Sequence, residues 1–146
     1  MYIYDKIFDM ELPKTYFRNS RECFLDPYRQ KLIIKTPEEV VRQRIAAYFV
    51  NNLGVPMDKI RLEEHLSHFG LSSKDRVDIV ILKYNETDGL NYPLAIVECK
   101  AETVELVDTV AYQAKRYADA LGCDYIFATN GIEIIVYKYV ESANEY

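Results

Sequence analysis

The sequence has 146 residues, the length of one ordinary domain that can bury a hydrophobic core. Hydrophobic residues make up 49% of it and charged residues 28%, a balance typical of globular proteins. The formal net charge of −5 weighs against a self-sufficient DNA-binding domain, because such domains usually present a basic surface. An enzyme that binds phosphates through a metal is compatible with this charge, since carboxylates are ligands of hard cations.

The composition also bears on the compartment. No apolar run approaches the roughly 20 residues that a membrane-spanning helix requires, and the N-terminus does not resemble a signal peptide. The three cysteines, Cys23, Cys99 and Cys123, are an odd number without paired spacing, which favours free thiols in a reducing compartment. We therefore expect a soluble cytoplasmic protein that has no membrane partner.

Three segments are expected along the chain. Residues 1–30 are rich in Tyr and Phe but lack a clear periodicity, and we expect them to form an N-terminal extension packed on the domain. Residues 31–140 would form the domain itself, which begins with a short apolar run at 31–35 that favours a strand. Residues 141–146 are expected to be a frayed tail.

The first predicted helix begins after Thr36 and extends to about Asn52. Thr36 is a suitable cap, a proline follows it, and Glu39 occupies the position of the carboxylate in a capping box. Helical periodicity places Glu38, but not Glu39, on the same face as a set of apolar residues. These residues are Val41, Ile45, Tyr48 and Phe49.

Two clear strands follow, at residues 76–82 and 94–100, and the first is apolar on both faces except at Asp78. Residues 60–66 favour a strand, although a helix is also compatible with their pattern. A polar loop with an Asp88-Gly89 turn is expected over residues 83–92.

The last elements predict a mixed sheet. Residues 103–121 form a long helix that ends before Gly122, residues 124–129 form a strand, and Asn130-Gly131 predicts a two-residue hairpin to a strand at 132–139. The helix would connect parallel neighbours. We expect an α/β fold (an α+β mixed sheet) whose central sheet is flanked by helices.

Charged residues interrupt both clear strands. Period two places Glu98 and Lys100 about 7 Å apart on one face of the second strand, next to an apolar run. Asp78 lies inside the apolar run of the first strand, and the pairing of the two strands would bring Asp78 and Glu98 together. A divalent cation relieves the repulsion between two such carboxylates. The alternatives are a charged surface strand and an aspartate satisfied by backbone donors.

Further polar residues fall on the apolar faces of the two predicted helices. Gln113 and Tyr117 lie one turn apart, and their alternative role is that of core residues. Glu38 adds a third acid, whose alternative role is to complement the helix dipole. The pair His65 and His68 lacks further metal ligands and is interpreted as surface residues.

The order and spacing of these motifs resemble a known family over residues 26–139. The chain looks like the N-terminal nuclease domain of type I restriction enzyme R subunits, a branch of the PD-(D/E)XK superfamily. Six segments carry the resemblance. They are Asp26-Pro27-Tyr28-Arg29, residues 36–43, residues 76–80, Val97-Glu98-Cys99-Lys100, Gln113-x-x-x-Tyr117 and Thr129-Asn130-Gly131.

The resemblance implies a restriction-endonuclease-like core and a Mg²⁺-dependent hydrolase of DNA, with Mn²⁺ as a substitute. Asp78 and Glu98 would bind the metal, and Glu38 would hold a second metal or a metal-bound water. Lys100 would orient the attacking water or stabilise charge on the phosphate. The Gln113 and Tyr117 motif is associated with positioning the DNA backbone.

Two features qualify this expectation. In the family the domain precedes a helicase-like motor, and the sequence given ends at Tyr146. We therefore expect a separate motor or specificity protein as a partner. The sequence is also compatible with an oligomer. The negative charge keeps two alternatives open, namely a non-cleaving DNA-binding or protein-interaction module that retains the nuclease fold, and a purely structural domain.

Overall fold

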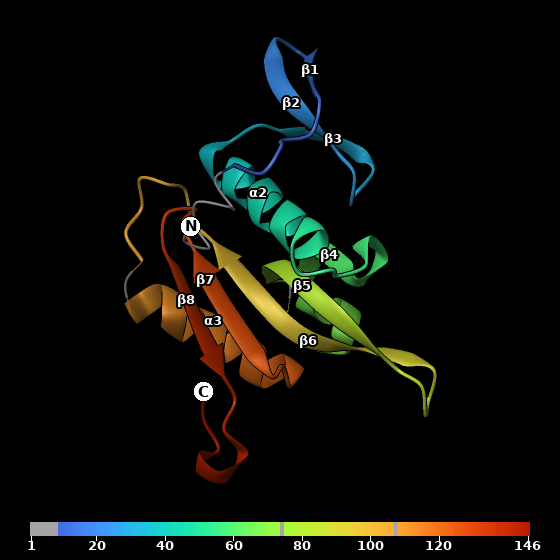
Figure 1. Ribbon diagram of the computed structural model, residues 1–146, viewed down its shortest axis with the longest axis vertical. Coiled ribbons are helices and arrows are strands. Elements are labelled where there is room, and N and C mark those ends of the chain that lie inside the picture. The colour runs from blue at the N-terminus through green and yellow to red at the C-terminus, as the bar shows by residue number, and fades with distance from the viewer. Residues whose placement is uncertain (1–8, 74, 107) are drawn as a thin grey trace.

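The computed structural model describes residues 9–146 except residues 74 and 107, with side chains for all of these except residues 108–111. The described chain forms a five-stranded sheet in the order β4-β5-β6-β7-β8 and a three-stranded sheet in the order β1-β2-β3 (Figure 1). Helix α2 lies between the two sheets, and helix α3 covers the opposite face of the larger one. The structure confirms the α/β fold with a central mixed sheet flanked by helices.

The N-terminal sheet consists of β1 (Thr15–Arg18), β2 (Arg21–Asp26) and β3 (Lys31–Ile34), all antiparallel. The strand at β3 was predicted, whereas β1 and β2 were not. Every residue of β1 is exposed and β2 does not alternate between buried and exposed positions, so neither shows the period-two pattern that identifies a strand. Residues 1–8 of the predicted extension lie outside the described residues.

Helix α2 (Pro37–Asn51) confirms the first predicted helix. The side chain of Thr36 accepts a hydrogen bond from the Glu39 backbone N–H at 3.0 Å, as expected of the cap. The prediction of a full capping box is wrong, because the Thr36 N–H donates to Ile34 and the Glu39 carboxylate contacts Arg29 and Arg42 instead. The helical periodicity identified only one buried face, whereas Glu39 is buried on a second face of the helix.

The central sheet is mixed. The pairing of β6 with β7 is parallel and all others are antiparallel, which confirms the predicted crossover through α3. The strands are β4 (Ile60–His65), β5 (Arg76–Asn85), β6 (Leu90–Cys99), β7 (Tyr125–Thr129) and β8 (Ile134–Lys138), and α3 is Asp108–Leu121. Short 3₁₀ helices occupy Met57–Lys59, Leu66–Phe69 and Glu141–Ala143.

Two apolar cores hold the helices against this sheet. One lies beneath α2 and includes Ile45 and Phe49, which pack with Ile79 and Val97 of the central strands. The other lies beneath α3 and is built mainly from small or aliphatic residues together with Tyr117. These opposed cores fix the two central strands on both faces, which is why β5 and β6 are nearly continuous apolar runs.

Several predicted boundaries were wrong. The expected loop at 83–92 is mostly strand, because β5 and β6 continue as an exposed hairpin that turns at residues 86–89. The connection at Asn130-Gly131 spans residues 130–133, because the Asn130 side chain accepts hydrogen bonds from two following backbone N–H groups. Residues 103–106 are not helical, and the Val104 carbonyl accepts from the Asn130 side chain.

The C-terminal residues are held rather than frayed, contrary to expectation. Val140 pairs with Glu145, and the Tyr146 hydroxyl donates to the Cys123 carbonyl. The three cysteines are free, as predicted, and all three are buried. Among the described residues, no helix has the length and apolar character needed to cross a membrane.

Candidate metal centre

Sheet register brings the acids of three adjacent strands together near the start of β5. In the pairing of β4 with β5, the residues on either side of Glu63 pair with the residues on either side of Asp78. Glu63 therefore lies across from Asp78. The pairing of β5 with β6, continued by one residue, places Glu98 across from Asp78 on the other side. The Asp78 carboxylate accepts a hydrogen bond of 2.7 Å from the Cys99 N–H, which fixes its position against β6.

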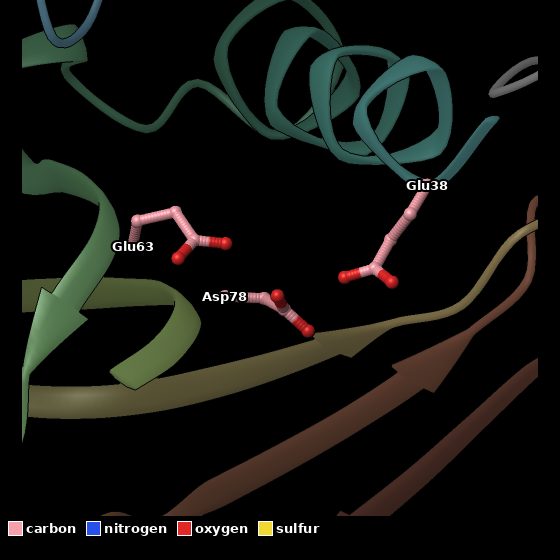
Figure 2. Close-up of side chains that lie close together, drawn as sticks. All are labelled: Glu38, Glu63 and Asp78. Atoms are coloured by element: carbon pink, nitrogen blue, oxygen red, sulfur yellow. The ribbon is translucent and has the colours of Figure 1, made fainter. Parts of the chain in front are cut away.

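Glu38, Glu63 and Asp78 form the acidic cluster. One carboxylate oxygen from each lies within 4.8 Å of those from the other two, and none of the three residues is fully exposed. Figure 2 shows the three carboxylates pointing toward one another from the start of α2, from β4 and from β5. This spacing suits a divalent cation with oxygen ligands.

Glu63 reaches the cluster through an unusual backbone conformation. Its φ is +52°, in the left-handed region that a residue with a Cβ seldom adopts. Such a conformation costs about 1–3 kcal/mol and persists only where the surrounding structure enforces it. The deviation interrupts the pairing of β4 with β5 at this residue.

Arg42 brings a positive charge into the acidic cluster. Its Nη2 lies 2.6 Å from Asp78 Oδ1 and 3.1 Å from Glu38 Oε1, and it also contacts Glu63. The side chain is 6% exposed, and its neighbouring carboxylates raise its pKa although burial alone would lower it. A cationic nitrogen therefore lies among the three carboxylates that could bind a metal.

Glu39 extends this network away from the sheet. Its carboxylate accepts from Arg42 Nη1 at 2.5 Å, from Arg29 Nη2 at 2.8 Å and from Gln43 Nε2 at 3.1 Å. Arg29 also pairs with the fully buried Asp26 of the N-terminal sheet. The start of α2 is thus connected to both sheets by buried charges.

Glu98 lies beside the cluster rather than in it. The residue is 5% exposed, and among the described residues its Oε1 has no hydrogen-bond partner. Burial and then the negative charge of Asp78 raise the pKa of Glu98 to about 9, despite the opposing effect of Lys100. A buried carboxyl oxygen without a partner is costly unless a ligand satisfies it.

Lys100 is half-buried at the end of β6, where its backbone N–H donates to the Thr129 carbonyl at 2.9 Å. Its positive charge lowers the pKa of both Glu38 and Glu98, while burial raises the pKa of Glu38 overall. Lys100 therefore acts electrostatically on Glu38 of the cluster and on the adjacent Glu98.

Gln113 and Tyr117 form a separate pair on α3. The Gln113 side-chain N–H donates to the Tyr117 hydroxyl at 2.9 Å, and Tyr117 belongs to the core beneath α3. Within the described part of the chain, no hydrogen bond or ion pair joins this pair to the acidic cluster. Nor does the structure support a metal site at the histidines, since His68 contacts Glu64 and its side chain is 57% exposed.

The predicted site and the observed cluster differ in one acid. Glu38 and Asp78 come together as expected, but the third carboxylate within ligand spacing is that of Glu63, with Glu98 adjacent. Glu63 was missed because period two places it on the face opposite Ile60 and Leu62, where an acid is interpreted as a solvent-facing residue. Arg42 was missed as well, although its spacing from Glu38 and Glu39 could have identified it as a neighbour of these acids, since residues three and four apart on a helix are neighbours.

Comparison with known protein families identifies the family of most of the chain. A family model described as type I restriction enzyme R protein N terminus matches residues 37–146. The chain belongs to this family. The match confirms the resemblance found in the motifs and begins at the first residue of α2, so β1, β2 and β3 lie outside it. No curated protein and no solved structure matches the chain.

Proposed function

We propose that the acidic cluster binds Mg²⁺, with Mn²⁺ as a substitute, and that the domain hydrolyses phosphodiester bonds of DNA. The observation that carries this proposal is the convergence of the Glu38, Glu63 and Asp78 carboxylates within 4.8 Å. The unpartnered Oε1 of Glu98 supports it independently, because it is a buried oxygen beside the same cluster. Membership of a restriction enzyme family supports DNA as the substrate.

The residues of the chain have distinct roles in this proposal. Asp78, Glu38 and Glu63 hold the cation, and Glu98 joins them when it is ionised. The bound metal lowers the pKa of water and offsets the charge of the phosphate. Lys100 stabilises charge on the phosphate or orients water, and Gln113 with Tyr117 positions the DNA backbone, as the family motif implies. A separate motor or specificity protein delivers the DNA.

A cleavage assay with matched variants tests the proposal. Supercoiled plasmid is incubated with the protein and Mg²⁺ or Mn²⁺, beside Asp78→Asn and Lys100→Ala. Asp88→Asn and Lys83→Ala, on the exposed hairpin, are controls that remove the same charges away from the cluster. We expect nicking or linearisation by the wild type and both controls, and a loss of at least 100-fold in the two site variants, about the size of one electrostatic contribution to a transition state. Equal cleavage by all five proteins would contradict the proposal, as would no cleavage under any condition.

A second candidate function is a module that binds without cleaving. Arg42 favours it, because its guanidinium already compensates the three carboxylates. In that case Arg42 is the permanent cation of the site, and neither Mg²⁺ nor Mn²⁺ changes the stability of the domain. A thermal unfolding series with increasing Mn²⁺ separates the two candidates, since a metal that binds the folded state raises the midpoint in proportion to the logarithm of its concentration.

A further inference from the structure

A cleft opens between the N-terminal sheet and β4. It has a volume of about 770 Å³ and is lined by residues of β1, β3, the first half of α2, β4 and the start of β5. Glu63 belongs to both this cleft and the acidic cluster, and Arg42, which contacts all three acids of the cluster, also lines the cleft. A ligand that lies in the cleft therefore comes into contact with the candidate metal centre.

The cleft is basic, although the chain as a whole is acidic. The chain has 18 Lys and Arg against 23 Asp and Glu, whereas basic residues outnumber acidic ones among the residues that line the cleft. The basic ones are Arg18, Arg29, Lys31, Arg42, Arg61 and Arg76. The acidic ones are Glu39, Glu63 and Glu64.

Two of the three acids of the cleft are already paired with arginines. Glu39 pairs with Arg29 and Arg42, Glu63 with Arg42 and, at 3.8 Å, with Arg76, while Glu64 contacts a histidine. These pairs leave the remaining cations of the cleft to determine its charge toward a ligand.

Three exposed cations remain, on both walls of the cleft. Arg18 ends β1 and Lys31 begins β3, and neither contacts a carboxylate among the residues that the structure describes. Arg61 lies on β4, where its Nη1 contacts the backbone carbonyl of Asp58 at 2.6 Å and leaves its other donors available. Exposed cations on both walls of a cleft suit a chain of phosphates, which carries regularly spaced negative charges.

We infer that this cleft binds the backbone of double-stranded DNA and that the N-terminal sheet forms one of its walls. The inference rests on the proposed function for the identity of the nucleic acid. It gives β1 and β3, which lie outside the matched family region, the role of holding phosphates beside the acidic cluster. Arg18 and Lys31 contact the backbone from one wall and Arg61 contacts it from the other. These contacts provide affinity without reading the base sequence.

Binding without metal tests the inference separately from catalysis. The probe is a fluorescein-labelled DNA duplex, and its anisotropy is measured in EDTA, so that cleavage does not occur. The double variant Arg18→Ala/Lys31→Ala is compared with Lys83→Ala/Lys138→Ala, which removes the same charge from exposed positions outside the cleft. Arg61→Ala tests the opposite wall, and Arg18→Lys/Lys31→Arg tests whether charge alone suffices.

We expect the Arg18→Ala/Lys31→Ala variant to bind the duplex at least tenfold more weakly at low salt. The slope of log Kd against log salt concentration should fall by about 1.8, since each phosphate contact contributes about 0.9. The charge-retaining variant and the remote double variant should bind like the wild type.

Equal losses in the Arg18→Ala/Lys31→Ala and remote double variants would overturn the inference, as would wild-type binding by the former. Tighter binding of an RNA duplex than of the DNA duplex would assign the cleft to RNA and overturn it as well. A protein that binds DNA through this cleft but never cleaves it would refute the proposed function and leave the inference intact.

Discussion

The two ends of α2 are buried by opposite means. Its first turns are surrounded by charge, with Glu38, Glu39 and Arg42 linked to carboxylates and cations of both sheets. Its later turns are apolar, and Ile45 and Phe49 pack into the core beneath the helix. The apolar end contributes stability through area removed from water, whereas the charged end costs desolvation that only pairing offsets. Stability alone therefore does not account for the charged end, and this agrees with the binding role proposed above.

The largest effect is expected at the apolar end. Phe49 is 3% exposed, and its ring packs edge-on against Phe127 with 5.2 Å between the ring centroids. Phe49→Ala therefore leaves a cavity. We expect the free energy of unfolding to fall by about 3–5 kcal/mol in urea titrations. Added Mn²⁺ should not change that loss. Phe17→Ala, at a position 75% exposed, is the control and should unfold like the wild type.

At the charged end we expect a somewhat smaller loss of stability, and this loss should depend on Mn²⁺. Arg42→Met removes the cation from the three carboxylates of the acidic cluster and from that of Glu39, and should lower stability by about 3 kcal/mol in EDTA. Mn²⁺ should restore part of this loss, because it compensates the same carboxylates. The matched control Arg116→Met lies at an exposed position of α3. A loss that Mn²⁺ leaves unchanged would remove the difference between the two ends.

At Glu98 the expected effect has the opposite sign, and its size depends on pH. Because its pKa is raised to about 9 in the folded chain, the folded state holds a proton that the unfolded state loses. Without metal, stability should therefore decline as the pH rises from the usual pKa of a glutamate toward 9. Glu98→Gln should raise stability above the usual pKa of a glutamate, by an amount that grows with pH and vanishes near pH 4. Thermal unfolding across this range measures it, with exposed Glu86→Gln as the control.

The central half of the fold could be predicted because its elements carry strong local patterns. Asp78 and Glu98 stood out as charges inside apolar strands, and the cap at Thr36 marked the start of α2. These features depend only on neighbours in the sequence. The predicted family followed from the same positions.

The remainder depends on contacts between distant segments. Glu63 enters the cluster because of a left-handed backbone conformation. The sequence pattern of an alternating strand does not predict such a conformation at an acidic residue. Glu39 is buried because a second sheet covers α2 on the side away from the core, and that sheet has no periodic pattern. Helical periodicity identifies one apolar face, and it does not identify a second face buried by charged pairs.

The central claim is that the acidic cluster binds a divalent metal, and a Mn²⁺ titration followed by the electron paramagnetic resonance of free Mn²⁺ tests it most directly. Asp78→Asn keeps an oxygen that accepts from the Cys99 N–H, so it removes the charge while the fold is retained. We predict saturable binding by the wild type and by the exposed control Asp88→Asn, and a loss of at least tenfold in affinity for Asp78→Asn. Equal Mn²⁺ binding by all three proteins, or no binding by the wild type, would contradict the account.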